Sequence, residues 1–178
     1  MTMQLIETKT LASAAASIEF TSIPQDATDL MVLFSHRSSG STDGLQLVLR
    51  FNGLTSGYSR MLVYGDGSSA AAGNGSSEAF ARFSFVQPSS STSNTFGNAS
   101  IYIPNYTSSR VKSFSSDAVT ETNATNINGA ALYAGRSNGT AAITSITLFE
   151  QNSVNFVANT MASLYKITKG SDGIVTTS

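Results

Sequence analysis

The segment Leu45-Gln46-Leu47-Val48-Leu49-Arg50-Phe51 carries an apolar residue at every odd-numbered position. In an extended chain these side chains lie on one face, whereas Gln46 and Arg50 point to the other. The next two residues, Asn52-Gly53, accept the positive φ angles of a tight turn. We therefore predict a half-buried β-strand that ends in a turn, and a second strand at 58–64 that forms a hairpin with it.

Most other apolar segments are equally short and alternating, and Gly, Asn, Ser or Pro residues bound them. The best helical candidate, residues 12–16, is small and lacks a wide apolar stripe. About ten strands without a helix predict an all-β chain. Beyond the two segments above, strands are expected at 17–20, 30–36, 78–86, 99–103, 110–114, 130–135, 141–150 and 161–167.

This number of strands with long connections is typical of a single antiparallel two-sheet β-sandwich over residues 1–178. We expect a jelly roll, with a small barrel as the alternative. The two ends, residues 1–11 and 168–178, are predicted to be extended arms. Two Ser-rich stretches, 65–77 and 87–95, have little to bury, so each is expected to be mobile unless a neighbouring chain orders it.

The composition excludes two classes of partner. Ser and Thr account for 50 of the 178 residues, whereas charged residues make up 12% and the net charge is −1. Scattered Lys and Arg argue against nucleic acid, which needs a basic patch, and against an anionic membrane surface. The longest run of large apolar residues, 30–34, is too short to span a bilayer. We expect a soluble protein with no nucleic-acid and no membrane partner.

No residue pattern predicts catalysis. His36, the only histidine, has the ordinary pKa of a general base, but we interpret it as a hydrogen-bonded or solvated residue at a strand end. Glu19, Glu78, Glu121 and Glu150 could pair as in a glycosidase, and we interpret them as solvated or strand-edge acids. The chain lacks cysteine and a Gly-x-Ser-x-Gly motif. We predict no enzymatic activity, no cofactor, and no catalytic, cofactor-binding or metal-binding residue.

Two features bear on recognition. The six tyrosines could stack on sugar rings, although Trp is absent and tyrosines at a core edge or subunit interface are the commoner case. Arg82 and Arg110, next to Phe80, Phe83 and Phe114, could anchor an interface. Strand alternation explains them equally as core-and-surface pairs, so we assign no site residue.

Five segments occur in order along most of the chain. They are 18–24 (IEFTSIP), 47–53 (LVLRFNG), 101–106 (IYIPNY), 142–148 (AITSITL) and 162–167 (ASLYKI). Together they resemble the small Ser/Thr-rich structural proteins encoded by tailed bacteriophages. Each segment alone is a strand with a turn, and their order over residues 18–167 carries the resemblance.

The resemblance implies a virion component with no catalytic residue to carry over. It further implies a capsid decoration, or cement, protein on the capsid exterior, a homotrimer that clamps neighbouring subunits of the major capsid protein. The alternative is a tail-fibre or tail-tip module that binds a host-surface glycan. Such a module would gather aromatic and acidic side chains at one end of the sandwich, and Tyr102, Tyr106 and Asp117 are too dispersed in the sequence to indicate such a cluster.

Overall fold

Strands and their connections make up the described chain. The computed structural model describes residues 2–42, 44–120 and 129–169, and these residues contain no helix. The all-β prediction is therefore confirmed. The strands are β1 (Thr2–Thr10), β2 (Ser17–Phe20), β3 (Asp29–His36), β4 (Gln46–Phe51), β5 (Tyr58–Gly65), β6 (Ala70–Glu78), β7 (Ala81–Phe85), β8 (Gly97–Ile103), β9 (Lys112–Val119), β10 (Ala130–Ser137), β11 (Ile146–Glu150) and β12 (Met161–Thr168).

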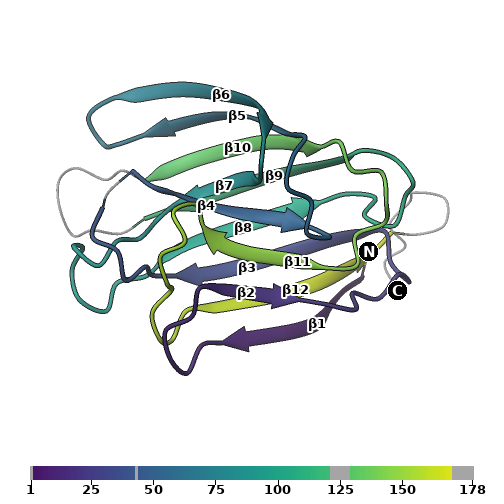
Figure 1. Ribbon diagram of the computed structural model, residues 1–178, viewed down its shortest axis with the longest axis horizontal. Helices are drawn as coiled ribbons and strands as arrows, with labels where there is room; N and C mark the ends of the chain where they lie inside the picture. Colours follow the sequence, from purple (N-terminus) through teal and green to yellow (C-terminus); the bar gives the residue numbers. More distant parts are fainter. Residues whose placement is uncertain (1, 43, 121–128, 170–178) are drawn as a thin grey trace.

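The strands form two antiparallel sheets (Figure 1). The long sheet has eight strands in the order β1-β12-β3-β8-β9-β10-β5-β6, and the short sheet has four in the order β2-β11-β4-β7. In Figure 1 the short sheet lies in front of the long sheet, and β5 and β6 extend past it at the top. The observed architecture is the two-sheet β-sandwich expected from the sequence.

Strand pairing is nested along the chain. β1 pairs with β12, β2 with β11, β3 with β8, and β4 with β7. A jelly roll consists of two four-stranded Greek keys, and it likewise pairs strands that are distant in sequence. The strand pairs β5–β6 and β9–β10 add four strands to one sheet, however, and the jelly-roll assignment stays a prediction.

The core fills the space between the sheets because alternate side chains of each strand point inward. In β9 the even-numbered residues are buried and the odd-numbered ones exposed. Phe34 of β3 packs edge-on against Phe156, with 5.4 Å between ring centroids, and lies 6.1 Å from the ring of Phe83 on β7. A smaller buried cluster consists of Leu62, Phe85, Ala131 and Tyr133.

The N-terminal arm predicted over residues 1–11 is wrong. Thr2–Thr10 is β1, an edge strand of the long sheet that runs antiparallel to β12. The strand docks because Ile6 and Leu11 pack against the core. Of the other predicted arm, 168–178, Thr168 ends β12, and residues 170–178 lie outside the described residues.

The hairpin expected between 45–51 and 58–64 is also wrong. β4 belongs to the short sheet and β5 to the long one, so the chain crosses between the sheets after β4. Tyr58 is buried at this crossing, and its hydroxyl oxygen accepts the backbone N–H of Phe51 at 2.9 Å. Alternation showed that both strands have a buried face, but it could not show which strand each one pairs with.

The stretch 65–77 contains a strand that the sequence did not predict. β6 consists mostly of Ala, Gly and Ser, yet it pairs with β5 along most of its length. The turn before β6 is fixed by Asp66, whose Oδ1 accepts the backbone N–H groups of Ser68 and Ser69 at 2.9 and 2.7 Å. These hydrogen bonds hold the pKa of the Asp66 carboxyl well below its ordinary value. Backbone pairing and turn chemistry thus form a strand where side-chain pattern gave no signal.

Candidate interaction surface

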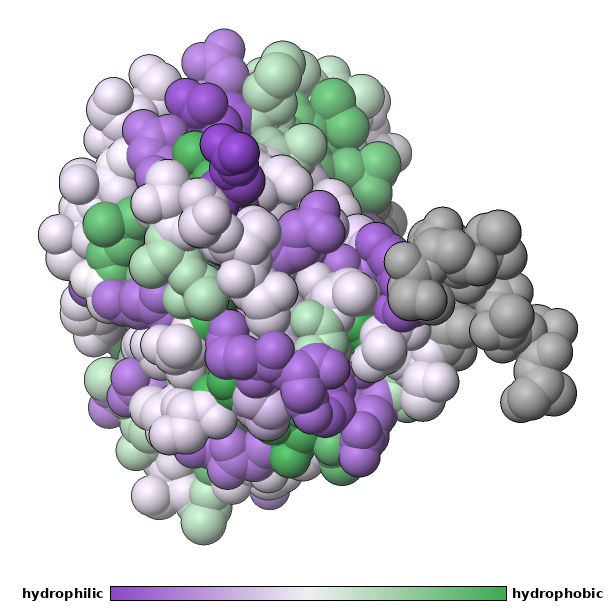
Figure 2. Space-filling model, turned by 90° about the vertical axis from the view of Figure 1, so that its right-hand side faces the viewer, coloured by the Kyte–Doolittle hydropathy of each residue, from purple (hydrophilic) through white to green (hydrophobic). Residues whose placement is uncertain are grey.

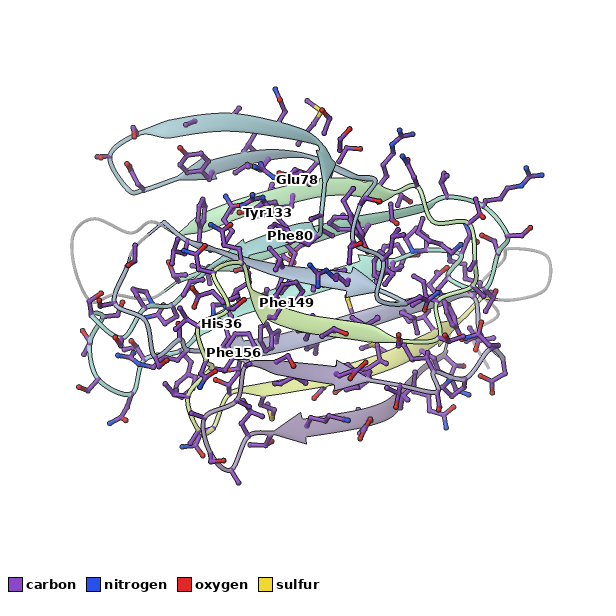
Figure 3. The ribbon with its side chains drawn as sticks, viewed as in Figure 1. His36, Glu78, Phe80, Tyr133, Phe149 and Phe156 are labelled. Atoms are coloured by element: carbon purple, nitrogen blue, oxygen red, sulfur yellow. The ribbon has the colours of Figure 1, made fainter. Side chains whose placement is uncertain are left out.

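His36 is inaccessible to a substrate. Its side chain is fully buried at the end of β3 (Figure 3), with the Phe34 ring centroid 5.2 Å away. Neither ring nitrogen has a hydrogen-bond partner among the described residues, and burial lowers the pKa of His36 to about 3. The expectation of a hydrogen-bonded or solvated side chain is therefore wrong. His36 shares the buried face of β3 with Leu30 and Val32.

The three candidate acids that the structure describes lie on different strands. Glu19 is exposed on β2, and Glu121 lies outside the described residues. Glu150 is fully buried at the end of β11, where one carboxylate oxygen accepts the hydroxyl of Ser38 at 2.5 Å. No group of three His, Asp or Glu side chains within the described part of the chain could hold a metal ion.

Glu78 joins two arginines where β6 approaches β7. Its carboxylate lies 3.3 Å from Nε of Arg60 and 3.0 Å from Nε of Arg82. The Arg82 guanidinium also lies over the ring of Phe80, 5.1 Å from its centre. Tyr133 is buried in the same region (Figure 3), and burial raises the pKa of its hydroxyl. These contacts within the chain agree with the interpretation of Arg82 as a structural pair rather than an exposed anchor.

The tyrosines do not form one platform. Tyr106 is fully buried, and its hydroxyl donates to the carbonyl oxygen of Pro24. Tyr102 is half-buried and donates its hydroxyl to Asp29 at 2.6 Å. Asp117, by contrast, is exposed on β9. Because Tyr106 is buried, it cannot join Tyr102 and Asp117 in an exposed sugar-binding cluster.

Arg37 orders the Ser-rich stretch 87–95 from within the chain. Its side chain is buried directly after β3. The guanidinium donates to the carbonyl oxygens of Ser89, Ser91, Thr92 and Thr95 at 2.7–3.1 Å. The expectation that this stretch is mobile unless a neighbouring chain orders it is therefore wrong. The sequence contained no signal for this role, because the contact depends on the loop folding back over the end of β3.

Lys112, the first residue of β9, has a matching role at the opposite end of the sandwich from Arg37. Its Nζ donates to the carbonyl oxygens of Ser108, Arg110 and Thr140 at 2.7, 2.5 and 3.3 Å. Burial lowers the pKa of Lys112, whereas the side chain of Arg110 is exposed. Two buried cations, Arg37 and Lys112, thus fix connections at opposite ends of the sandwich by donating to peptide carbonyls. The sequence did not predict this role for either residue.

The outer face of the long sheet exposes a continuous apolar surface on β5, β6 and β10. Met61 is 69% exposed, Val63 54% and Leu132 58%, and Leu132 lies directly opposite Val63 across the β10–β5 pair. Ala72 lies beside Val63 on β6. Figure 2 shows hydrophobic residues gathered at the upper right, at the end that β5 and β6 occupy in Figure 1. We call the part of the outer face that β5, β6 and β10 form the apolar half.

A shallow depression of about 360 Å³ lies in the apolar half, and none of its lining residues is charged. Toward β12 the face carries more polar side chains, although apolar ones remain. Ser100 lies opposite Asp117 across the β8–β9 pair, and its hydroxyl donates to that carboxylate. A second depression there, also about 360 Å³, is lined in addition by Ser163 and Tyr165 and by the exposed apolar residues Leu33 and Met161. The outer face therefore divides into an apolar half, which has Arg136 at the end of β10, and a mixed half toward β12 that we call the hydroxyl-rich half.

No protein-family model, curated protein or solved structure matches the chain. None of the described residues belongs to a helix that could cross a membrane. The resemblance to phage structural proteins thus rests on the five sequence segments, and the outer face is the best-supported functional surface.

Proposed function

We propose that the protein is a non-catalytic virion component, a capsid decoration (cement) protein that binds neighbouring subunits of the major capsid protein on the capsid exterior. The observation that carries this proposal is the apolar half, where Met61, Val63 and Leu132 are more than half exposed and adjoin one another. Exposed apolar patches of this kind are typical of protein-interaction sites. The sequence resemblance supplies the class of partner.

The chemistry of the apolar half suits a large protein partner. Its depression has no charged lining, so burial of that depression does not require desolvation of a charged side chain in its lining. Burial of apolar surface stabilises a contact by about 25 cal/mol per Å². A specific interface covers roughly 800 Å² on each partner, more than three side chains provide. We therefore place the contact over β10, β5 and β6 together with the adjoining part of β9.

A repeated lattice strengthens such a contact. We propose that three copies come together as a homotrimer only on the capsid, at its three-fold positions, as the resemblance implies. When several copies bind linked sites, the second and third contacts form at a high effective concentration, so the assembly binds far more tightly than one copy. The weak surface charge of the chain, −1 in total, limits repulsion between neighbouring copies.

Mass spectrometry of purified particles of the phage that encodes the chain tests this function. We expect a copy number of the same order as that of the major capsid protein, because a decoration protein occupies repeated lattice sites. A handful of copies would contradict the capsid role and favour the tail-fibre or tail-tip alternative, with the hydroxyl-rich half as its glycan surface. Absence from the particle would overturn any virion role.

A further inference from the structure

The four edges of the two sheets differ in how they are protected against pairing with another strand. β1 carries Glu7 and Lys9 and has a register irregularity between Leu5 and Glu7. On the short sheet, β2 has four residues including Glu19, and β7 has five and meets its partner with a register shift. Charges, bulges and short length are the usual protection of an exposed edge.

β6 lacks this protection over residues 70–75, which pair regularly with β5, whereas its end has a register irregularity at residues 76–77, where Ser77 has a positive φ. It has nine residues, AAAGNGSSE, and its single charged residue is Glu78 at the end. Among the described residues β5 is its one partner, so toward them its other side presents unpaired backbone N–H and C=O groups. The small side chains of β6 leave this edge sterically open. The uncharged, open edge over residues 70–75 is suited to pairing with another extended strand.

We propose that the occupant is β6 of a second copy, paired antiparallel about a two-fold axis at Asn74. In this register Asn74 lies opposite its own copy, where two amide side chains can donate to and accept from each other. Glu78 of each copy then lies beyond the irregularity at residues 76–77, toward Ala70 of the other copy, so the two charges are at opposite ends of the pair. A parallel pairing would instead set Glu78 against Glu78, which is unfavourable.

The pairing also extends the apolar half across the axis. Met61 lies opposite Asn74 on β5, so the two copies of Met61 would stand about 14 Å apart, three strand spacings. Ala72 and Asn74 of both copies would form the floor between them. The pairing thus joins two apolar halves into one surface, although it does not depend on the proposed function.

The contact is small, which sets its expected strength. A nine-residue strand is about 30 Å long, and one strand edge covers less than the roughly 800 Å² per partner of a stable interface. We therefore expect a weak dimer with a dissociation constant of about 10 µM to 1 mM. Sedimentation velocity from about 5 µM to about 500 µM should show the mass shift from monomer to dimer.

Charge variants at the axis test the pairing. Asn74→Lys and Asn74→Asp each set like charges against one another, and each is expected to weaken the dimer at least about tenfold. An equimolar mixture of the two should restore a heterodimer, which a misfolded variant could not do. Thr10→Lys, on the exposed edge strand β1, should dimerise as the original protein does. A protein that stays monomeric, sediments as a trimer, or dimerises unchanged with Asn74→Lys would overturn the proposal.

The register has its own test because the chain contains no cysteine. Directly opposed residues of antiparallel strands have Cα atoms about 4.5–5.5 Å apart, within the range a disulfide requires. Asn74→Cys is therefore expected to form a covalent dimer on mild oxidation. Ala70→Cys is the control, because its copy would lie about 26 Å away. Equal cross-linking of the two variants, or cross-linking of neither, would contradict the two-fold register.

Discussion

Replacing Arg37 with Met is expected to lower the free energy of unfolding by about 3 kcal/mol. The guanidinium of this buried residue donates to four carbonyl oxygens of the stretch 87–95, and Met leaves those acceptors without their charged donor. Urea unfolding followed by circular dichroism measures the loss. Because the loop is released rather than the core emptied, we expect the β-sheet spectrum of the folded state to be retained.

Arg136→Met is the matched control for this prediction. Arg136 is exposed on β10, and its Nε lies 3.4 Å from the hydroxyl of Ser59, so we expect a change of at most about 0.5 kcal/mol. Arg37→Lys keeps the charge but loses the planar fork that reaches several carbonyls, and we expect an intermediate loss. Equal unfolding free energies for Arg37→Met and Arg136→Met would show that the carbonyl contacts of Arg37 do not order the loop.

Acidification is expected to destabilise the protein from about pH 6.5 downward, well before most carboxylates protonate. Burial lowers the pKa of His36 to about 3 in the folded state from an ordinary value of 6.5. Between these values the unfolded chain binds a proton that the folded chain does not, so stability falls as the pH falls. The slope approaches about 1.4 kcal/mol per pH unit within this window.

Urea unfolding between pH 7 and pH 4.5 measures this loss. His36 is the only histidine, so the window reports one residue and ends before the ordinary pKa values of Asp and Glu. His36→Leu, which cannot titrate, is the control, and its unfolding free energy should be nearly independent of pH over the same range. If the original protein showed a flat profile, or if His36→Leu kept the slope, His36 would not be the buried neutral ring described here.

The sequence predicted buried faces better than it predicted partners. The alternation of Leu30, Val32 and Phe34 placed β3 correctly, because one apolar face is enough to specify a half-buried strand. β6 escaped prediction because its pairing is made by backbone groups and its Ala and Gly residues have no strand pattern. The wrong β4–β5 hairpin has a different cause, since sheet membership depends on contacts between distant parts of the chain.

The interaction surface could not be predicted from the sequence, for a related reason. Along β5 and β10, apolar residues occur on both faces of the sheet. Leu62 and Tyr133 point inward, whereas Met61 and Leu132 point outward. Only the position of the short sheet, which covers one face, decides which of these side chains stay exposed. Likewise, Arg37 and Lys112 acquire their roles from carbonyl groups that turns bring together.

Binding to capsids that lack the protein tests the proposed role of the apolar half most directly. Leu132→Asp places a charge in its centre, at a side chain that is exposed and not needed for the core. We expect co-sedimentation of this variant with capsids to require at least about tenfold more protein than the original chain does. Ser17→Asp, exposed on β2 of the short sheet, should bind unchanged. Unaltered binding of Leu132→Asp, or an equal loss with Ser17→Asp, would contradict the assignment of this surface.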